Sequence, residues 1–237
     1  MRQFTTGISS LDTQLGGGLS SGSVVLLLEE PGAGADIFSL HVAIEGLKNN
    51  EKVLYVTTDD TVEELKESIS LYFDVSTDIL SQIDIIDLVS TRMGLPTEED
   101  SAKAYLKRTR YDTLSGLKTS IQDERYDRVI INNITYFFTH YDREEVFKLI
   151  EDFSATTKQD ESLFFMLMTK GMFDHQTEVA MKHSGDGVIE FTMREIEDEM
   201  QRRLKVLKLK RALVPKTVLR YDLTNKGFRM ESVMRVL

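Results

Sequence analysis

The sequence predicts an α/β protein with a mostly parallel central sheet, helices on both faces of the sheet and an antiparallel extension at the carboxyl end. Short apolar runs rich in β-branched residues alternate with amphipathic helical patterns as far as Gly187. Beyond Gly187, segments that alternate apolar and polar residues follow one another without a helical pattern. Alternating strands and helices favour parallel strands joined by right-handed crossovers, and successive strands favour antiparallel pairing.

The individual elements follow from these patterns. Parallel strands are predicted at Ser23–Leu28, Lys52–Thr57, Ile83–Leu88, Arg128–Asn132 and Leu163–Thr169. Helices are predicted at Asp36–Asn49, Val62–Leu71, Glu98–Asp123, Arg143–Lys158 and Glu178–His183. Turn signals at Pro215 and at Asn225-Lys226-Gly227 separate the antiparallel strands, which are predicted at Val188–Met193, Leu204–Lys210, Thr217–Asp222 and Phe228–Glu231.

Composition indicates one globular domain that spans residues 1–237. Hydrophobic residues make up 41% and charged residues 29% of the 237 positions, and no repeat or linker interrupts them. No apolar run reaches the roughly 18–20 residues that cross a bilayer, and the amino end lacks a signal-peptide core, so we expect a cytoplasmic protein. The chain has no cysteine, and its four histidines have no metal-binding spacing. We therefore expect no disulfide and no metal site.

A glycine-rich turn between the first predicted strand and helix has the outline of a phosphate-binding loop. Its residues are Glu29-Glu30-Pro31-Gly32-Ala33-Gly34-Ala35-Asp36. In the pattern G-x-x-x-x-G-K-[ST], the glycines let backbone N–H groups approach phosphate, the Lys reaches the terminal phosphates and the hydroxyl holds magnesium. Here Glu29 replaces the first Gly, Ala35 the Lys and Asp36 the hydroxyl residue. The sequence predicts a phosphate cradle that has lost its chemistry.

Several motifs in the same order resemble those of the RecA-like ATPases, in the group that contains KaiC, RadA and GvpD. They cover most of the chain: Thr6–Asp12, Leu15–Ser23, Pro31–Gly34, Val53–Asp60, Tyr126–Thr135, Ser184–Ile189 and Leu207–Arg211. The resemblance implies a RecA-like P-loop NTPase fold.

The resemblance also assigns roles to residues outside the loop. It aligns Asn132 with the acid that orients magnesium, and an amide cannot supply that acid's charge. It aligns Asp59 and Asp60 with the acids that polarise the attacking water, although both are shorter than glutamate. Asp59 and Asp60 also suit the start of the following helix, which is a purely structural interpretation.

The losses in the loop favour weak nucleotide binding. A charge-assisted contact contributes about 1.5–3 kcal/mol, so replacing the Lys by Ala35 alone predicts binding about 10- to 150-fold weaker. Asp36 places a carboxylate where the helix dipole would attract phosphate, and the protein's own acid can occupy the anion site. Asp36 also has alternative interpretations, as an ordinary helix cap or as a direct magnesium ligand. We expect no bound cofactor, or ATP and magnesium held weakly.

The carboxyl end is basic in an acidic chain. Residues 201–237 contain eleven Lys and Arg against two acids, whereas the whole chain carries a formal net charge of −10. In the family that this chain resembles, a Lys-x-Arg pair reaches the nucleotide of the next subunit, which implies an interface at Lys208, Lys210 and Arg211. A nucleic-acid surface and a solvated basic ribbon are the alternatives.

These observations favour a catalytically inactive RecA-like protein that acts in regulation or assembly through protein contacts. Its partner would be a second copy, an active relative or a signalling protein, and the loop acids, together with Asp59 and Asp60, would face a neighbour's basic end. A weak ATP-binding protein or slow ATPase is the first alternative. A DNA recombination or repair accessory protein is the second.

Overall fold

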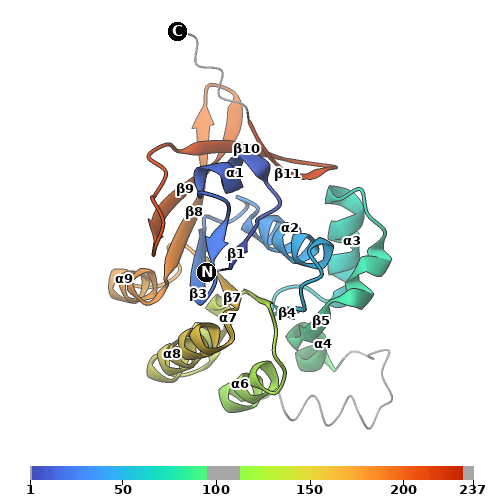
Figure 1. Cartoon of the computed structure of the whole chain (residues 1–237), viewed down its shortest axis with the longest axis vertical. Helices are drawn as coiled ribbons and strands as arrows, with labels where there is room; N and C mark the ends of the chain where they lie inside the picture. The colour runs from blue at the N-terminus through green and yellow to red at the C-terminus, as the bar shows by residue number, and fades with distance from the viewer. Residues whose placement is uncertain (1, 95–112, 232–237) are drawn as a thin grey trace.

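A nine-stranded sheet organises the part of the chain that the structure describes. The computed structural model describes residues 2–94 and 113–231, and Figure 1 shows its backbone. The strand order is β11-β10-β9-β8-β3-β7-β6-β4-β5. Neighbouring strands from β8 to β5 are parallel, and those from β8 to β11 are antiparallel. The predicted fold class, a mostly parallel sheet with an antiparallel carboxyl extension, is confirmed.

The central parallel strands β3, β4, β6 and β7 are buried on both faces because helices cover each face, whereas the edge strand β5 and the distal half of β8 are partly exposed. The parallel strands are β3 (Ser23–Glu29), β4 (Val53–Thr57), β5 (Asp84–Asp87), β6 (Arg128–Asn132), β7 (Leu163–Thr169) and β8 (Gly187–Ile196). Along β3, Val25 and Leu27 enter one hydrophobic core, whereas Val24, Leu26 and Leu28 enter the other. This alternation explains why β3 reads as a continuous apolar run.

Helices form a layer on each side of the sheet (Figure 1). One core contains side chains of α2 (Ala35–Lys48) and α3 (Val62–Tyr72), and the other contains those of α6 (Leu114–Gln122), α7 (Thr135–His140) and α8 (Arg143–Asp160). Side-chain caps begin several of them, including a capping box at Thr61 and Glu64. The remaining helical segments are α1 (Ser9–Gln14), the 3-10 helix η1 (Thr77–Gln82), α4 (Leu88–Met93) and α9 (His175–Ser184).

The antiparallel extension consists of β9 (Glu199–Leu209), β10 (Leu219–Thr224) and β11 (Gly227–Met230), paired in sequence after β8. The β8–β9 hairpin continues to the pair Ile196–Glu199, several residues past the predicted strand ends at Met193 and Leu204. Its distal residues are exposed, and all of them except Ile196 and Met200 are charged. The apolar alternation that marks a half-buried strand is therefore absent there.

Other boundaries also differ from those predicted. Of the predicted helix Glu98–Asp123, residues 114–122 are helical, and residues 98–112 lie outside the described part of the chain. The strand predicted to end at Leu88 ends at Asp87, because the Asp87 side chain caps α4 by accepting from the Ser90 amide. Two short strands, β1 (Gln3–Phe4) and β2 (Leu19–Ser20), were not predicted, because two residues carry no periodic signal.

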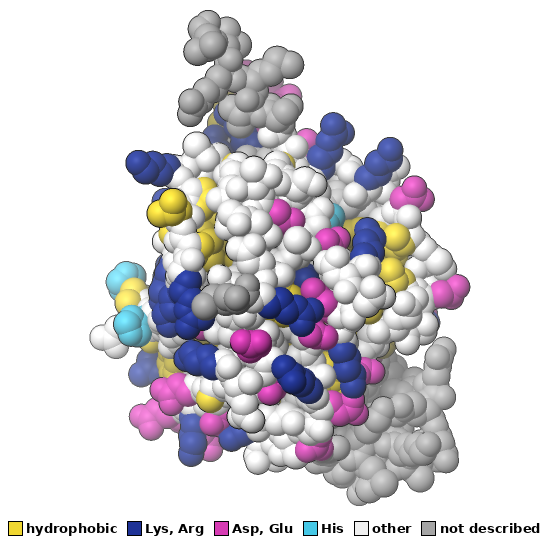
Figure 2. All heavy atoms as spheres, in the orientation of Figure 1, with side chains coloured by type: hydrophobic (Ala, Val, Ile, Leu, Met, Phe, Trp, Pro, Cys, Tyr) yellow, Lys and Arg dark blue, Asp and Glu magenta, His cyan; other side chains and the backbone are white. Residues whose placement is uncertain are grey.

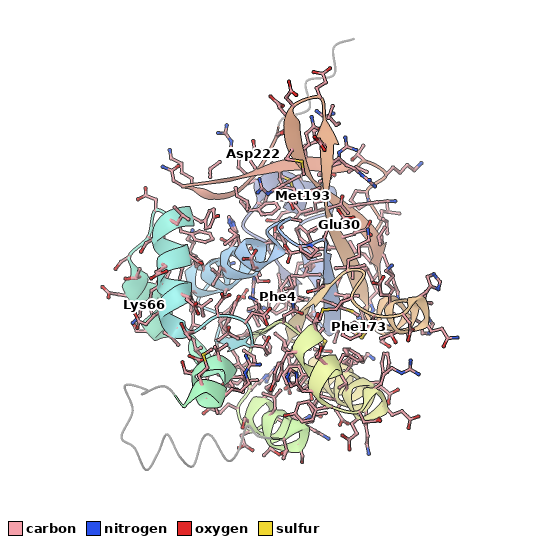
Figure 3. The ribbon with its side chains drawn as sticks, turned by 180° about the vertical axis from the view of Figure 1, so that it is seen from behind. Phe4, Glu30, Lys66, Phe173, Met193 and Asp222 are labelled. Carbon is pink, nitrogen blue, oxygen red and sulfur yellow. The ribbon has the colours of Figure 1, made fainter. Side chains whose placement is uncertain are left out.

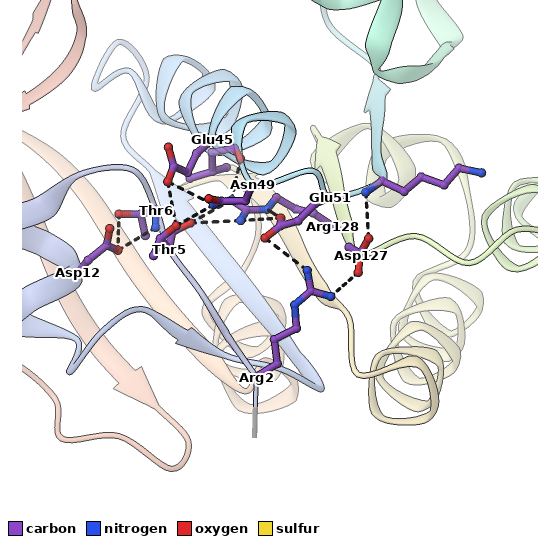
Figure 4. Close-up of polar contacts among 11 residues, drawn as sticks. Arg2, Thr5, Thr6, Asp12, Glu45, Asn49, Glu51, Asp127 and Arg128 are labelled. Carbon is purple, nitrogen blue, oxygen red and sulfur yellow. Dashed lines mark hydrogen bonds and ion pairs between the residues drawn. The ribbon is translucent and has the colours of Figure 1, made fainter.

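A buried arginine joins the amino-terminal segment to the sheet. Arg128 on β6 is 0% exposed, and its Nε donates to Glu51 Oε2 at 2.8 Å. Its guanidinium also donates to the carbonyl oxygens of Thr5 and Val42. Figure 4 shows how Arg2 extends this network toward Glu51 from the amino-terminal end. Because the guanidinium is paired and hydrogen-bonded, its burial is tolerated.

Candidate functional site

The glycine-rich loop keeps the backbone of a phosphate cradle. It runs from the end of β3 to Ala35, the first residue of α2, and Gly32 and Gly34 have φ angles of 85° and 88°. A β-carbon on Gly34 would lie 2.5 Å from Leu223 Cδ1. Both glycines are therefore required, because other residues rarely adopt this conformation and Leu223 leaves no room at Gly34.

The loop amides are already occupied by a side chain of the loop. Glu29 Oε1 accepts hydrogen bonds from the backbone N–H groups of Gly34 at 2.6 Å and Ala35 at 3.0 Å. These amides lie at the N-terminus of α2, where the helix dipole favours an anion. A carboxylate of the protein thus takes the position in which a phosphate-binding loop holds phosphate.

Asp36 lies beside this carboxylate and not on the loop amides that Glu29 occupies. Burial raises the pKa of the Asp36 carboxyl, and the backbone N–H groups of Ile37 and of Asp36 itself partly oppose this rise, which agrees with its interpretation as a helix-terminal residue. The sequence suggests that Asp36 can occupy the anion site, whereas in the structure Glu29 accepts from the Gly34 and Ala35 amides. From the sequence, Glu29 is interpreted as a lost glycine and as one of the loop acids that would face a neighbour's basic end, and not as the group that occupies the loop amides.

Burial raises the pKa values of three acids in this region, Glu29, Asp36 and Asp60. Burial raises the pKa of Glu29 to about 7, although the Ala35 and Gly34 amides oppose the rise. Burial also raises the pKa of Asp60 to about 6, and Asp36 adds to the effect by repulsion. The pKa of Asp36 is raised in the same way by burial and by Asp59. Neighbouring like charges and desolvation both disfavour ionised carboxylates.

A cleft of about 540 Å³ brings together residues from all of the predicted nucleotide-site motifs. It lies beyond the carboxyl ends of β3, β4, β6 and β7, where open α/β sheets bind ligands. The predicted site residues that line it are Glu29, Gly32, Gly34, Asp36, Asp59, Asp60 and Asn132.

Two loop residues point elsewhere, and two others are covered. The Glu30 carboxylate accepts from the Met193 amide at 2.9 Å and pairs with Lys170 at 3.1 Å, so it joins the loop to β8 (Figure 3). Pro31 is exposed, and Ala33 and Ala35 are buried at 0% exposure. None of these four residues lines the cleft.

Asn132 lies at the end of β6, where the resemblance implies a magnesium-orienting acid. It is 2% exposed and lines the cleft, and its Nδ2 donates to the Tyr55 hydroxyl at 3.0 Å. Its Oδ1 is buried and accepts no hydrogen bond from the part of the chain that the structure describes. The position therefore provides a neutral amide with one unsatisfied acceptor.

Sequence analysis missed the contribution of the carboxyl-terminal sheet to this site. The Tyr221 hydroxyl on β10 donates to the Ala33 carbonyl at 2.6 Å, and Leu223 packs on Gly34. Arg202 on β9 lines the cleft and is its one basic side chain among the described residues. No sequence signal joins these positions to the loop, because more than 160 residues separate them from it.

The predicted interface residues lie away from the cleft. Lys208 Nζ donates to the carbonyl oxygens of Lys182, His183 and Gly185. These carbonyls lie at the C-terminus of α9, so the lysine caps that helix. Lys210 forms a salt bridge with Asp186. Arg211 follows in a turn after β9. Two of the three side chains therefore have local structural roles, and a subunit contact at these positions stays a prediction.

ATP with magnesium does not fit the residues that are present. The loop amides are bonded to Glu29, and Ala35 and Asp36 provide neither a cation nor a hydroxyl. Asn132 adds no negative charge for a metal-bound water. No three Asp, Glu or His side chains within residues 2–94 and 113–231 are grouped so that they could hold a metal ion.

The fold and the loop define a RecA-like protein of the P-loop class. A profile described as "ATPase: KaiC" matches residues 4–232, and the chain therefore belongs to this KaiC family. A UPF0273 protein from Pyrococcus horikoshii is 24% identical over 231 residues, which cover 95% of this chain and 92% of the relative. No helix within the described residues is long and apolar enough to cross a membrane.

Two further comparisons agree with the fold. The flagellar accessory protein FlaH from Methanocaldococcus jannaschii has a TM-score of 0.76 at 17% identity, and the match covers 98% of this chain and 100% of that chain. The DNA repair protein RadA from Aquifex aeolicus is 44% identical over 57 residues, which are 24% of this chain and 13% of that protein. The first similarity concerns the fold alone, and the second is confined to a short segment.

Proposed function

We propose that this protein is a pseudo-ATPase of the KaiC family that acts in regulation or assembly through protein contacts. The observation that carries this proposal is the Glu29 carboxylate on the Gly34 and Ala35 amides. Phosphoryl transfer depends on positioning and on positive charge at the phosphates. Here the anion position is filled by the protein, and its surroundings are negative.

The charges of the cleft oppose a nucleotide. A triphosphate would have to displace Glu29 from two amide hydrogen bonds and then lie near Asp36, Asp59 and Asp60. Arg202 is the one described cation that lines the cleft, and it compensates only part of this charge. With no Lys at position 35, the lost contact alone weakens binding by about 10- to 150-fold.

Calorimetric titration with ATP and magnesium, together with an assay for released phosphate, tests this proposal. We expect neither saturable binding nor turnover. A variant that restores the loop pattern, Glu29→Gly/Ala35→Lys/Asp36→Thr, should bind ATP at least tenfold more tightly than a control that carries Ala35→Lys alone, because Glu29 still occupies the amides in the control. Steady phosphate release by the wild-type chain, abolished in Asp59→Asn/Asp60→Asn, would contradict the proposal and support a slow ATPase.

Assembly would use the opposite charges of the two ends of the chain. Residues 201–237 carry a net charge of +9, so the rest of the chain carries −19. Figure 2 shows that acidic and basic side chains are interspersed on the face that it draws, so that face is not uniformly basic. We propose head-to-tail contact in which basic side chains of one copy approach the acidic cleft of the next.

Sedimentation velocity at several protein concentrations and ionic strengths tests assembly. Association should strengthen with concentration and weaken with salt, because screening reduces attraction between exposed charges. An unchanged monomer across both ranges would exclude association between identical copies. Salt-dependent binding of DNA would instead favour an accessory role on nucleic acid.

A further inference from the structure

The cleft beside the loop carries more negative charge than its walls balance. Four carboxylates line it, from Glu29, Asp36, Asp59 and Asp60, and Arg202 is the one described cation among the lining residues. None of these four carboxylates forms a salt bridge within the described part of the chain. Glu29 is buried, Asp36 and Asp60 are half-buried, and Asp59 is exposed. Uncompensated charge is costly where it is removed from water, so a cation near the first three would be stabilising.

A second observation, independent of the acids, indicates that a hydrogen-bond donor is missing. Asn132 lines the cleft at 2% exposure, and its Oδ1 has no partner among the described residues. Its Nδ2 is engaged with the Tyr55 hydroxyl. Buried acceptors in proteins are rarely left unpaired, and an unpaired one costs about 1–3 kcal/mol. An N–H group of a cationic ligand would satisfy this oxygen.

Ser68, Asn133 and Thr169 add polar groups to the cleft wall, and the remaining part of the wall is apolar. It includes Ile37, Leu71, Tyr72, Leu167 and Leu223, and Leu71 is 64% exposed at its edge. Apolar walls suit the methylene segments of an aliphatic cation. The acids are not grouped to hold a metal ion within the described residues. The volume of about 540 Å³ lies within the range of small-molecule sites, roughly 300–1,000 Å³.

We propose that this cleft binds an aliphatic polyamine. Its ammonium groups would donate to Asp36, Asp59, Asp60 and Asn132 Oδ1, and its methylene segments would pack on Leu71 and the other apolar side chains. The inference rests on the proposed function, because a cleft that bound the phosphates of a nucleotide would not also accept a polycation. It makes the degenerate loop a part of a cation site.

Calorimetric titration of the full chain with spermidine at pH 8 tests the proposal. At this pH Glu29 and Asp60, with pKa values of about 7 and about 6, are ionised. We expect saturable one-to-one binding that weakens at least tenfold in Asp59→Asn/Asp60→Asn. The matched control Glu144→Gln/Glu145→Gln removes the same charge from exposed positions on α8 and should change affinity less than threefold.

A third variant tests the same site in case Asp59→Asn/Asp60→Asn does not fold. Leu71→Lys places an ammonium group at the cleft edge on an exposed position, so the fold should tolerate it, and spermidine should bind at least tenfold more weakly. Absence of saturable binding to the wild-type chain would overturn the proposal. Equal weakening in the α8 control would also overturn it, because attraction would then depend only on net charge.

Two further outcomes separate this inference from the proposed function. If ATP binds tightly, the proposed pseudo-ATPase function fails, whatever spermidine does. If neither ATP nor spermidine binds, the polyamine proposal alone fails. If Asp59→Asn/Asp60→Asn abolishes self-association while the wild-type chain binds no spermidine, the cleft receives Lys or Arg side chains of a second copy, and the polyamine proposal is overturned.

Discussion

Replacing Glu29 by Gln isolates the energetic effect of the carboxylate that fills the loop. Glutamine keeps a carbonyl oxygen that can accept from the Gly34 and Ala35 amides, but it does not ionise. The charged groups that influence Glu29 come from other elements: Asp36 on α2 and Asp59 after β4. The variant therefore removes one buried charge from beside Asp36 and Asp59 and preserves the shape of the loop.

The magnitude follows from the pKa of Glu29. Its pKa is raised from 4.5 to about 7, so the folded state holds a proton that the unfolded state has released, and stability falls as pH rises through this interval. The difference corresponds to about 3 kcal/mol. The free energy of unfolding of the wild type, measured relative to Glu29→Gln, should therefore fall by about 3 kcal/mol between pH 4.5 and pH 8. The variant should gain stability at neutral and alkaline pH.

Urea unfolding of both proteins across this pH range measures the effect, and Glu30→Gln provides a control with the opposite sign. Burial by itself would raise the pKa of Glu30, but the Met193 amide and Lys170 outweigh it and hold that pKa below its usual value. Glu30 therefore stabilises the fold above its unfolded pKa, and this contribution is lost as pH falls through its folded pKa. Glu30→Gln should lose stability at neutral pH.

One result would refute this reasoning. If the stabilities of the wild type and of Glu29→Gln run parallel from pH 4.5 to pH 8, Glu29 has an ordinary pKa and the loop amides balance its burial. The loop amides would then hold the ionised Glu29 carboxylate at no net cost in stability.

Three further predictions concern the contacts that hold the site. Arg128→Met should lower the free energy of unfolding by about 3–5 kcal/mol in urea, because Glu51 stays buried without its partner; a loss below about 1 kcal/mol would contradict this account. Tyr221→Phe should cost about 1–2 kcal/mol by thermal unfolding, since the Ala33 carbonyl loses its donor, and an unchanged melting temperature would exclude this role. Lys208→Met should speed amide hydrogen exchange in the last turn of α9; unchanged exchange with lost self-association would favour an interface role instead.

The sequence by itself determined the parallel strands, the main helices and the chemistry missing from the loop. Strands such as β3 and β7 are continuous apolar runs because both faces are buried, and this pattern is visible without a structure. Helix α8 carries its own start signal, Asp142, whose side chain accepts from the Glu144 amide. The absence of a Lys and of a hydroxyl residue in the loop is a fact of the sequence alone.

Only the tertiary structure decided how the site is filled. The Glu29 carboxylate accepts from backbone amides five and six residues further along the chain, and hydrophobic periodicity does not predict such a contact. Arg202 and Tyr221 reach the site because the antiparallel extension folds back over the loop. A hydrophobic pattern shows which face of an element is buried, but the residues packed against that face are set by chain topology over long sequence distances.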